Sequence, residues 1–197
     1  VYGCIKITRI LRDDGYPKLS VNRVSRLMKQ LGIRSVTIRK FKNYRNKQNE
    51  HSELKNLVNQ NFSAQKPNQI WLSDITYIHT VKNGWTYLAS VLDVCTRKIV
   101  GYSYGRKMDR SLVISALTNS WQNQNYPNNV ILHSDRGSQY TSSEYIAAAV
   151  RMGFRLSYSK KGCPFDNAPM ESFHSVLKKE EVYLKHYSSF YEANIRL

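Results

Sequence analysis

Apolar residues recur at helical spacing in the first part of the chain. Within residues 20–31 they form one face, with Ser20 before it as a helix cap and Gly32 after it. A shorter pattern of the same kind spans residues 2–13, so we predict two short helices separated by a Gly-Tyr-Pro turn. The second predicted helix has a basic polar face, which fits a helix-turn-helix-like DNA-binding segment. A basic helical hairpin that only packs on its neighbour fits the pattern equally well.

Strand-like runs begin at residue 69, where Val, Ile, Thr and Tyr become frequent. Turn signals at residues 82–84 and 93–97 divide them into three strands that we expect to be antiparallel. Helical and strand patterns then alternate. The expected elements are strands over 70–80, 85–94 and 98–104, a helix over 110–122 capped by Asp109, a strand over 129–132, a helix over 142–152 with Thr141 and Glu144 as its capping box, a strand over 154–158, a loop over 159–167, and a helix from near 169 past 181.

This order predicts an α/β fold with a mixed sheet, in which three antiparallel strands are followed by parallel ones. We divide the chain where its residue composition and periodicity change. Residues 1–40 form the helix-turn-helix-like segment, residues 41–66 a basic linker, and residues 67–197 the core domain, whose C-terminal end we expect to be truncated.

The net charge of the chain indicates a class of binding partner. The 197 residues carry a net charge of +16, and residues 1–66 hold 15 Lys and Arg against 4 Asp and Glu. A basic surface of this size indicates a polyanion, and nucleic acid is the first candidate. The sequence has no 18-residue apolar run and no signal peptide, and its three cysteines have no metal-binding spacing. We therefore expect no membrane partner and a cytoplasmic, nucleoid-associated location.

Three carboxylates occupy positions where a structural role alone is less expected. Asp74 lies inside the first strand, Asp135 follows the fourth, and Glu171 lies in the first turn of the last helix. In a mixed sheet of this order the first strand commonly lies beside the fourth, which would make Asp74 and Asp135 neighbours. Adjacent carboxylates repel one another, and a divalent cation resolves the conflict. Each residue by itself also has an ordinary explanation, such as a helix N-terminal acid for Glu171.

Four segments carry a resemblance to a known family. The segments Trp71–Tyr77, Gly84–Ala89, His133–Thr141 and Lys161–Phe173 resemble the integrase-core transposases of bacterial insertion sequences, most nearly the OrfB type of the IS-three family. Asp135 and Glu171 are separated by 35 residues, as in that family.

The resemblance implies a ribonuclease-H-like sheet with helices on both faces and an Asp74–Asp135–Glu171 catalytic triad. It also implies two Mg²⁺ or Mn²⁺ ions per active site when DNA is bound, held by the same three residues. The expected reaction is cleavage and transfer of DNA strands at the element's ends. We expect contacts to DNA from Lys178, Arg136, Lys160, Lys161, Gln139, His174, Arg23 and Arg26.

Several alternatives and partners remain open. A DNA-binding regulator, or a nuclease with the same core that only hydrolyses, would share these residues. The expected partners are double-stranded DNA (terminal inverted repeats and target), further copies of the chain on DNA, and an upstream-encoded DNA-binding protein or fusion. The loop over 159–167 either orders on DNA binding or is rigid, with Asp166 and Asn167 as caps.

Overall fold

The computed structural model describes residues 2–35, 54–160 and 162–197. Their contacts divide them into two compact units. The first holds the N-terminal helices together with residues 178–184, and the second holds the sheet, its covering helices and the C-terminal residues 185–197. Each unit is considered by itself.

The first unit contains the two predicted helices, α1 (Cys4–Asp13) and α2 (Val21–Gln30). Ser20 caps α2, because its side chain accepts a hydrogen bond from the backbone N–H of Arg23. Gly32 adopts a left-handed conformation with φ of 69° just beyond the helix end, where glycine is favoured. Both helices, and the two ends predicted for α2, therefore follow the sequence pattern.

The second unit is built on a five-stranded sheet with the order β3-β2-β1-β4-β5. The pairs β1–β2 and β2–β3 are antiparallel, whereas β1–β4 and β4–β5 are parallel, which confirms the predicted mixed sheet. The strands are β1 (Ile70–Thr80), β2 (Gly84–Asp93), β3 (Ile99–Gly105), β4 (Ile131–Ser134) and β5 (Arg155–Tyr158).

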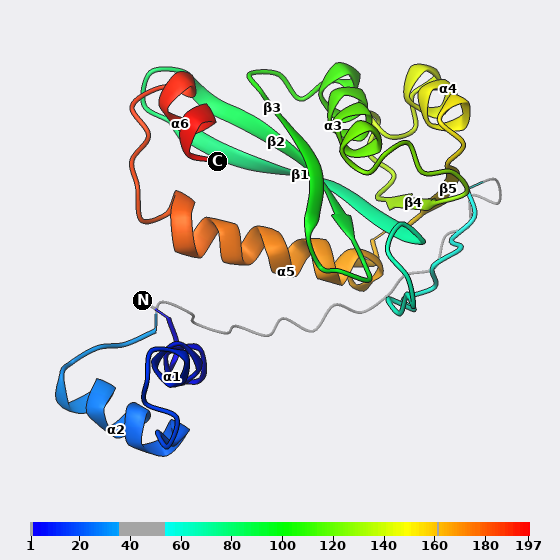
Figure 1. Cartoon of the computed structure of the whole chain (residues 1–197). Helices are drawn as coiled ribbons and strands as arrows, with labels where there is room; N and C mark the ends of the chain where they lie inside the picture. The colour runs from blue at the N-terminus through cyan, green and yellow to red at the C-terminus, as the bar shows by residue number, and fades with distance from the viewer. Residues whose placement is uncertain (1, 36–53, 161) are drawn as a thin grey trace. The chain divides into compact units, whose positions relative to one another are not determined.

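Helices cover both faces of this sheet, as expected (Figure 1). Helices α3 (Arg110–Asn123) and α4 (Ser143–Arg151) lie on one face, and α5 (Ala168–Leu177) lies on the other. Trp71, Ala89 and Leu117 belong to the larger apolar core under α3 and α4. Met170 of α5 packs with Leu72 in the smaller core. Neighbouring positions of β1 thus face opposite cores, which puts Asp74 on the α5 side.

Several predicted boundaries differ from the structure by one or two residues, and two of these differences have a clear local cause. The fourth strand begins two residues later than expected, because Asn129 has a left-handed φ of 59° that a strand cannot continue. The cap of α4 is Ser142 rather than Thr141: Ser142 accepts from the N–H of Tyr145. Thr141 instead donates its hydroxyl to the carbonyl of Gly137, closing the turn after Asp135.

The last predicted helix is also not one continuous helix. A 3₁₀ turn (Pro164–Asn167) precedes α5, and a π-helical turn (Lys178–Val182) follows it. The N–H of Tyr183 donates to the carbonyl of Lys178 at 2.7 Å, the five-residue spacing of a π-helix. A further helix, α6 (Phe190–Arg196), was not predicted. No helix among the described residues is long and apolar enough to cross a membrane.

Candidate active site

Asp74 and Asp135 are brought level with one another by the parallel pairing of β1 and β4. Leu72 pairs with His133, and the same register two residues farther on sets Asp74 beside Asp135. Asp135 directly follows the last residue of β4, at the carboxyl end of a parallel strand. Carboxyl ends of such strands are where α/β sheets bind ligands.

Asp74 has two partners of different kinds. Its Oδ1 accepts a hydrogen bond from the N–H of Ile75 at 2.8 Å. Its Oδ2 lies 3.4 Å from Nδ1 of His174 on α5. His174, from which we expect a contact to DNA, is only 7% exposed and faces this catalytic candidate. This contact joins α5 directly to β1 at the site.

Asp135 is oriented by the turn that follows it. The N–H of Gly137 donates to Oδ1 of Asp135 at 2.9 Å. A Cβ at position 137 would lie 3.0 Å from that same oxygen, closer than most such contacts, so a glycine suits this position. Burial raises the pKa of Asp135 and the charge of Asp74 raises it further, while the Gly137 hydrogen bond lowers it.

Glu171 lies in the first turn of α5 and joins the same electrostatic site. Burial raises its pKa, Asp74 raises it further, and His174 lowers it. Both Glu171 and Asp135 remain exposed at the surface, so solvent screens these effects. The charge of Asp74 acts on both Asp135 and Glu171, which ties the carboxylates of three separate elements to one region of the surface.

The chemistry of these donors fits a hard divalent cation. Three carboxylates and no thiolate favour Mg²⁺ or Mn²⁺ over softer metals, and their repulsion would be relieved by positive charge. Among the described residues, no group of three or more His, Cys, Asp or Glu already has the geometry of a metal site. The sheet and α5 therefore place the three carboxylates in one region, but their oxygens are not close enough together to form a metal site among the described residues.

The DNA-contact candidates near Asp135 are held by backbone carbonyls. Arg136 donates from Nε to the carbonyl of Ser159 and from Nη2 to that of Leu54. Gln139 donates from Nε2 to the carbonyl of Met108. Lys160 has an exposed side chain, while its backbone N–H donates to Asp166. Lys161 lies outside the described residues.

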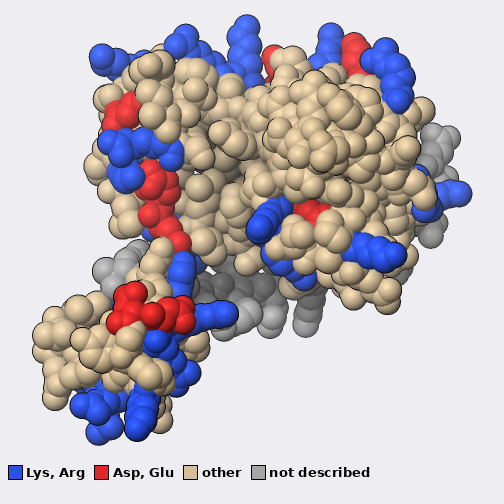
Figure 2. All heavy atoms as spheres, in the orientation of Figure 1, with Lys and Arg blue, Asp and Glu red and all other residues tan. Residues whose placement is uncertain are grey.

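The other DNA-contact candidates belong to the first unit. Arg23 and Arg26 are exposed on α2, and Lys178 begins the π-helical turn. Figure 2 shows that Lys and Arg side chains outnumber Asp and Glu on the visible surface. A basic face of this kind suits a phosphate backbone.

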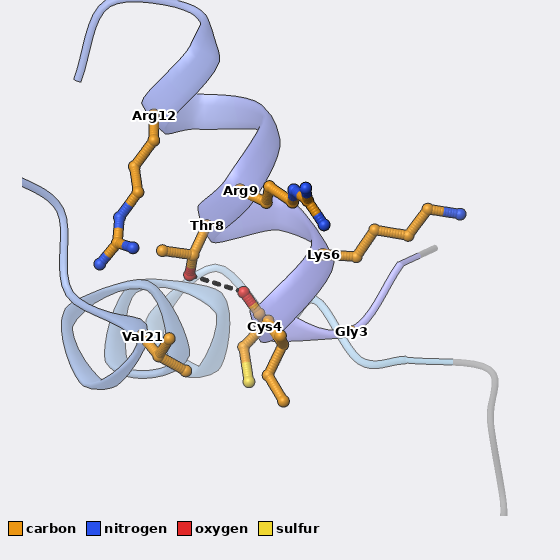
Figure 3. A pocket seen from close by; sticks show the side chains of 8 residues that line it. Gly3, Cys4, Lys6, Thr8, Arg9, Arg12 and Val21 are labelled. Atoms are coloured by element: carbon orange, nitrogen blue, oxygen red, sulfur yellow. Dashed lines mark hydrogen bonds between the residues drawn. The ribbon is translucent and has the colours of Figure 1, made fainter. Parts of the chain in front are cut away.

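A basic hollow on α1 was not anticipated from the sequence. It has a volume of about 680 Å³ and is lined by residues of α1 and by Val21 of α2. Figure 3 shows Lys6, Arg9 and Arg12 along this helix. The spacing of these three cations, three residues apart on a helix, was the signal that would have identified them.

The sequence also gave no indication of a buried polar network beside the site. His133 is fully buried, and its ring nitrogens lie 2.8 Å from Ser157 Oγ and 3.1 Å from Ser159 Oγ. Asp166 is buried as well and accepts hydrogen bonds from Asn56 and Gln60. Both described ends of the loop over 159–167 are thus hydrogen-bonded to the sheet or to residues before it, and the choice between a rigid loop and one that orders on DNA stays a prediction.

Two domain families match the chain. The HTH-like domain matches residues 1–41, and the integrase core domain matches residues 64–164, a range that includes Asp74 and Asp135 and ends before Glu171. Both families point to DNA as the partner.

Curated relatives extend the likeness over nearly the whole chain. The transposase for insertion sequence element IS904 of Lactococcus lactis is 40% identical over 193 residues, covering 98% of this chain and 75% of that protein. Transposase InsF for insertion sequence IS3A of Escherichia coli is 39% identical over 188 residues, covering 95% of this chain and 65% of InsF.

Solved structures share the fold at low sequence identity. The catalytic domain of Mos1 mariner transposase aligns with a TM-score of 0.52 and 13% identity, over 65% of this chain and 67% of that one. A chain of the simian T-cell lymphotropic virus intasome aligns with a TM-score of 0.54 and 23% identity, over 58% of this chain and 40% of that one. Together with the 40% identity to a transposase matched over three quarters of its length, these findings show that the chain belongs to the integrase-core transposases of bacterial insertion sequences related to IS3.

Proposed function

We propose that this chain cleaves DNA strands at the ends of an insertion sequence and joins them to a target, with Asp74, Asp135 and Glu171 as its catalytic residues. The observation that carries this proposal is the placement of the carboxylates: the register of β1 against β4 sets Asp74 beside Asp135, and α5, whose first turn holds Glu171, contacts Asp74 through His174. Perturbed carboxylates at the end of a parallel strand are a typical signature of a catalytic site.

Mg²⁺ or Mn²⁺ is the proposed cofactor, with two ions per site when DNA is bound. The ions would be held by the three carboxylates, and when bound they supply a stronger nucleophile and stabilise the leaving oxygen. Gly137 orients the Asp135 carboxylate through its N–H, and Nδ1 of His174 lies 3.4 Å from one oxygen of Asp74. These contacts limit how the ligand oxygens can turn, which preorganises the site.

The bond changes are the same type in both steps. In cleavage, the oxygen of a water molecule forms a bond to phosphorus, and the bond from phosphorus to the 3′ oxygen breaks. In joining, a DNA 3′-hydroxyl takes the place of the water, and the target's 3′ oxygen leaves. One site can therefore perform both reactions if the DNA ends are positioned correctly.

A product assay tests this function against its rivals. End-labelled DNA carrying the element's inverted repeat is incubated with the chain, Mg²⁺ and a supercoiled target. We expect nicked ends together with products joined to the target. Nicking without joined products would indicate a nuclease, and DNA binding without either product would indicate a regulator.

The proposal also assigns the binding partners of each part of the chain. Residues 1–40 would bind the terminal repeats, the core domain over 67–197 would act on the ends, and Lys178, Arg136, Lys160, Lys161 and Gln139 would contact phosphates. Assembly of several copies on DNA would bring two ends together, and an upstream-encoded DNA-binding protein or fusion would supply additional recognition. A protein acting on chromosomal DNA would be found at the nucleoid.

DNA affinity should depend on the exposed arginines of α2. Replacing Arg23 and Arg26 with Gln should reduce the slope of log affinity against log salt by about 0.9 for each lost phosphate contact. Affinity would be measured by fluorescence anisotropy with duplex DNA across a salt series. Replacing exposed Lys66 and Lys98 together with Gln gives a charge-matched control on the core domain. Equal slopes for wild type and the α2 variants would show that α2 does not contact phosphates.

A further inference from the structure

Residues 54–60 cover the outer edge of the sheet, and we call them the bracing segment. Strand β5 is an edge strand, and the N–H of Tyr158 in β5 donates to the carbonyl of Lys55 at 3.0 Å. The N–H of Leu57 donates to Ser157 Oγ at 2.9 Å, and Val58 is only 4% exposed. From residue 54 onward, the stretch predicted as linker is therefore packed on the core domain.

The bracing segment ends at the carboxylate of Asp166, which is 1% exposed. Oδ2 of Asp166 accepts from Nδ2 of Asn56 at 2.9 Å and from the N–H of Lys160 at 2.8 Å. Oδ1 accepts from Nε2 of Gln60 at 2.7 Å and from Sγ of Cys163 at 3.3 Å. Burial alone would raise the pKa of Asp166, but the hydrogen bonds from Lys160, Gln60 and Cys163, together with His133, lower it. The buried carboxylate is thus hydrogen-bonded through both of its oxygens.

Asp166 lies on the path to Glu171. It belongs to the 3₁₀ turn that continues directly into α5, and Glu171 follows five residues later. The next residue, Asn167, donates from Nδ2 to the carbonyl of Ser73 at 3.4 Å, beside Asp74. The start of α5 is therefore held from two sides, by the bracing segment and by β1. A shift of this turn would move Glu171 relative to the two aspartates.

The bracing segment also reaches the neighbour of Asp135. Arg136 donates to the carbonyl of Leu54 at 3.2 Å and to that of Ser159 at 2.9 Å. One short segment consequently contacts both the turn after Asp135 and the turn before Glu171. Among the described residues, the side chains of Asn56 and Gln60 provide the hydrogen bonds that connect Asp166 to the segment preceding β1.

We propose that Asn56, Gln60 and Asp166 are positioning residues through which the bracing segment holds Glu171 in place opposite Asp74 and Asp135. The role assigned to Glu171 rests on the function proposed above. Asn56 and Gln60 lie before the range matched by the integrase core family, so they extend the functional core toward the N-terminus. They act on the reaction only through the position of Glu171.

A reversed hydrogen bond tests this role in the full chain. Gln60→Glu points a carboxylate at the carboxylate of Asp166, and Gln60→Leu removes the amide donor; each of these single variants loses the bond. The double variant Gln60→Glu/Asp166→Asn restores it with donor and acceptor exchanged, and keeps the total charge of the pair. Gln65→Glu, an exposed Gln-to-Glu change with no bond to Asp166 shown, is the matched control.

The first readout is steady-state cleavage of end DNA with Mg²⁺. Each single variant should lower kcat by about 10- to 100-fold, the scale of a small misplacement of a catalytic group, with KM for DNA changed by less than about twofold. The double variant should return to within about threefold of wild type, because contacting residues couple. The proposal would be overturned if kcat of the double variant were no higher than that of the less active single variant. It would also be overturned if the single variants had the same kcat as Gln65→Glu.

The second readout is hydrogen exchange of the amides of residues 166–171 without metal or DNA. These amides should exchange at least about tenfold faster in each single variant and recover in the double variant. Unchanged exchange in both single variants would reject the positioning role whatever the activity. If the wild-type chain shows no cleavage while exchange follows the expected pattern, the proposed function fails and the bracing contact stands.

Discussion

Replacing Asp135 with Asn should lower the rate of DNA strand cleavage by about 10³-fold or more, the scale of losing a single group that stabilises charge in a transition state. Asp74→Asn and Glu171→Gln should have effects of the same order, because the proposed function assigns the three carboxylates to one site. Combining two of these changes should cost little more than one, since residues that act as a unit are not additive.

DNA binding should survive these substitutions, because the basic surface remains. Affinity measured by anisotropy should stay within about threefold of wild type, or increase slightly as negative charge is removed near phosphates. Glu144 is an exposed carboxylate of α4 that pairs with Arg110 of α3, on the face of the sheet away from α5. Glu144→Gln should therefore leave cleavage intact. Full cleavage by Asp135→Asn would contradict the triad assignment.

The same variants offer a reading that is independent of activity. With Asp74 replaced by Asn, the pKa of both Asp135 and Glu171 should fall, because one charge that raises them is gone. Burial still raises both, so the pKa values should move toward their ordinary range without reaching it. Carboxyl chemical shifts followed through a pH titration would report this directly, and unmoved values would place Asp74 outside the site.

Acidification should destabilise the fold through His133. This side chain is fully buried, and burial lowers its pKa to about 4, although Asp166 acts in the opposite direction. In the unfolded chain the pKa is about 6.5, so the unfolded state takes up a proton first as pH falls. The stability contributed by neutral His133 is complete above about pH 6.5 and is lost between 6.5 and 4, at a total of about 3 kcal/mol.

Denaturant unfolding at pH 7, 6, 5 and 4 measures this loss. His133→Gln should be less stable than wild type at pH 7, since its contacts to Ser157 and Ser159 are disturbed. Its stability should then fall less steeply with acid, because the titrating group is gone. His186→Gln, at an exposed histidine, serves as the control. Parallel curves for wild type and His133→Gln would show that His133 is not the group responsible.

The order of elements could be predicted because it depends on local patterns. Alternating Val, Ile, Thr and Tyr produced the antiparallel strands, and side-chain caps such as Ser20 and Asp109 set helix starts within one turn. The neighbouring positions of Asp74 and Asp135 also followed from sequence, because a mixed sheet of this order pairs its first and fourth strands. Boundaries were less predictable where the backbone took an unusual conformation, as at Asn129.

The sequence alone determined which side chains are available: a strand aspartate, an aspartate after a parallel strand, a helical glutamate, and a basic N-terminal third. Only the tertiary structure decided which of them meet other groups. It turned His174 inward to Asp74 and buried Asp166 among donors from the bracing segment, more than a hundred residues earlier in the chain. Such contacts have no local signature, because a hydrogen bond between distant residues depends on where the whole sheet places their backbones, not on the residues beside them.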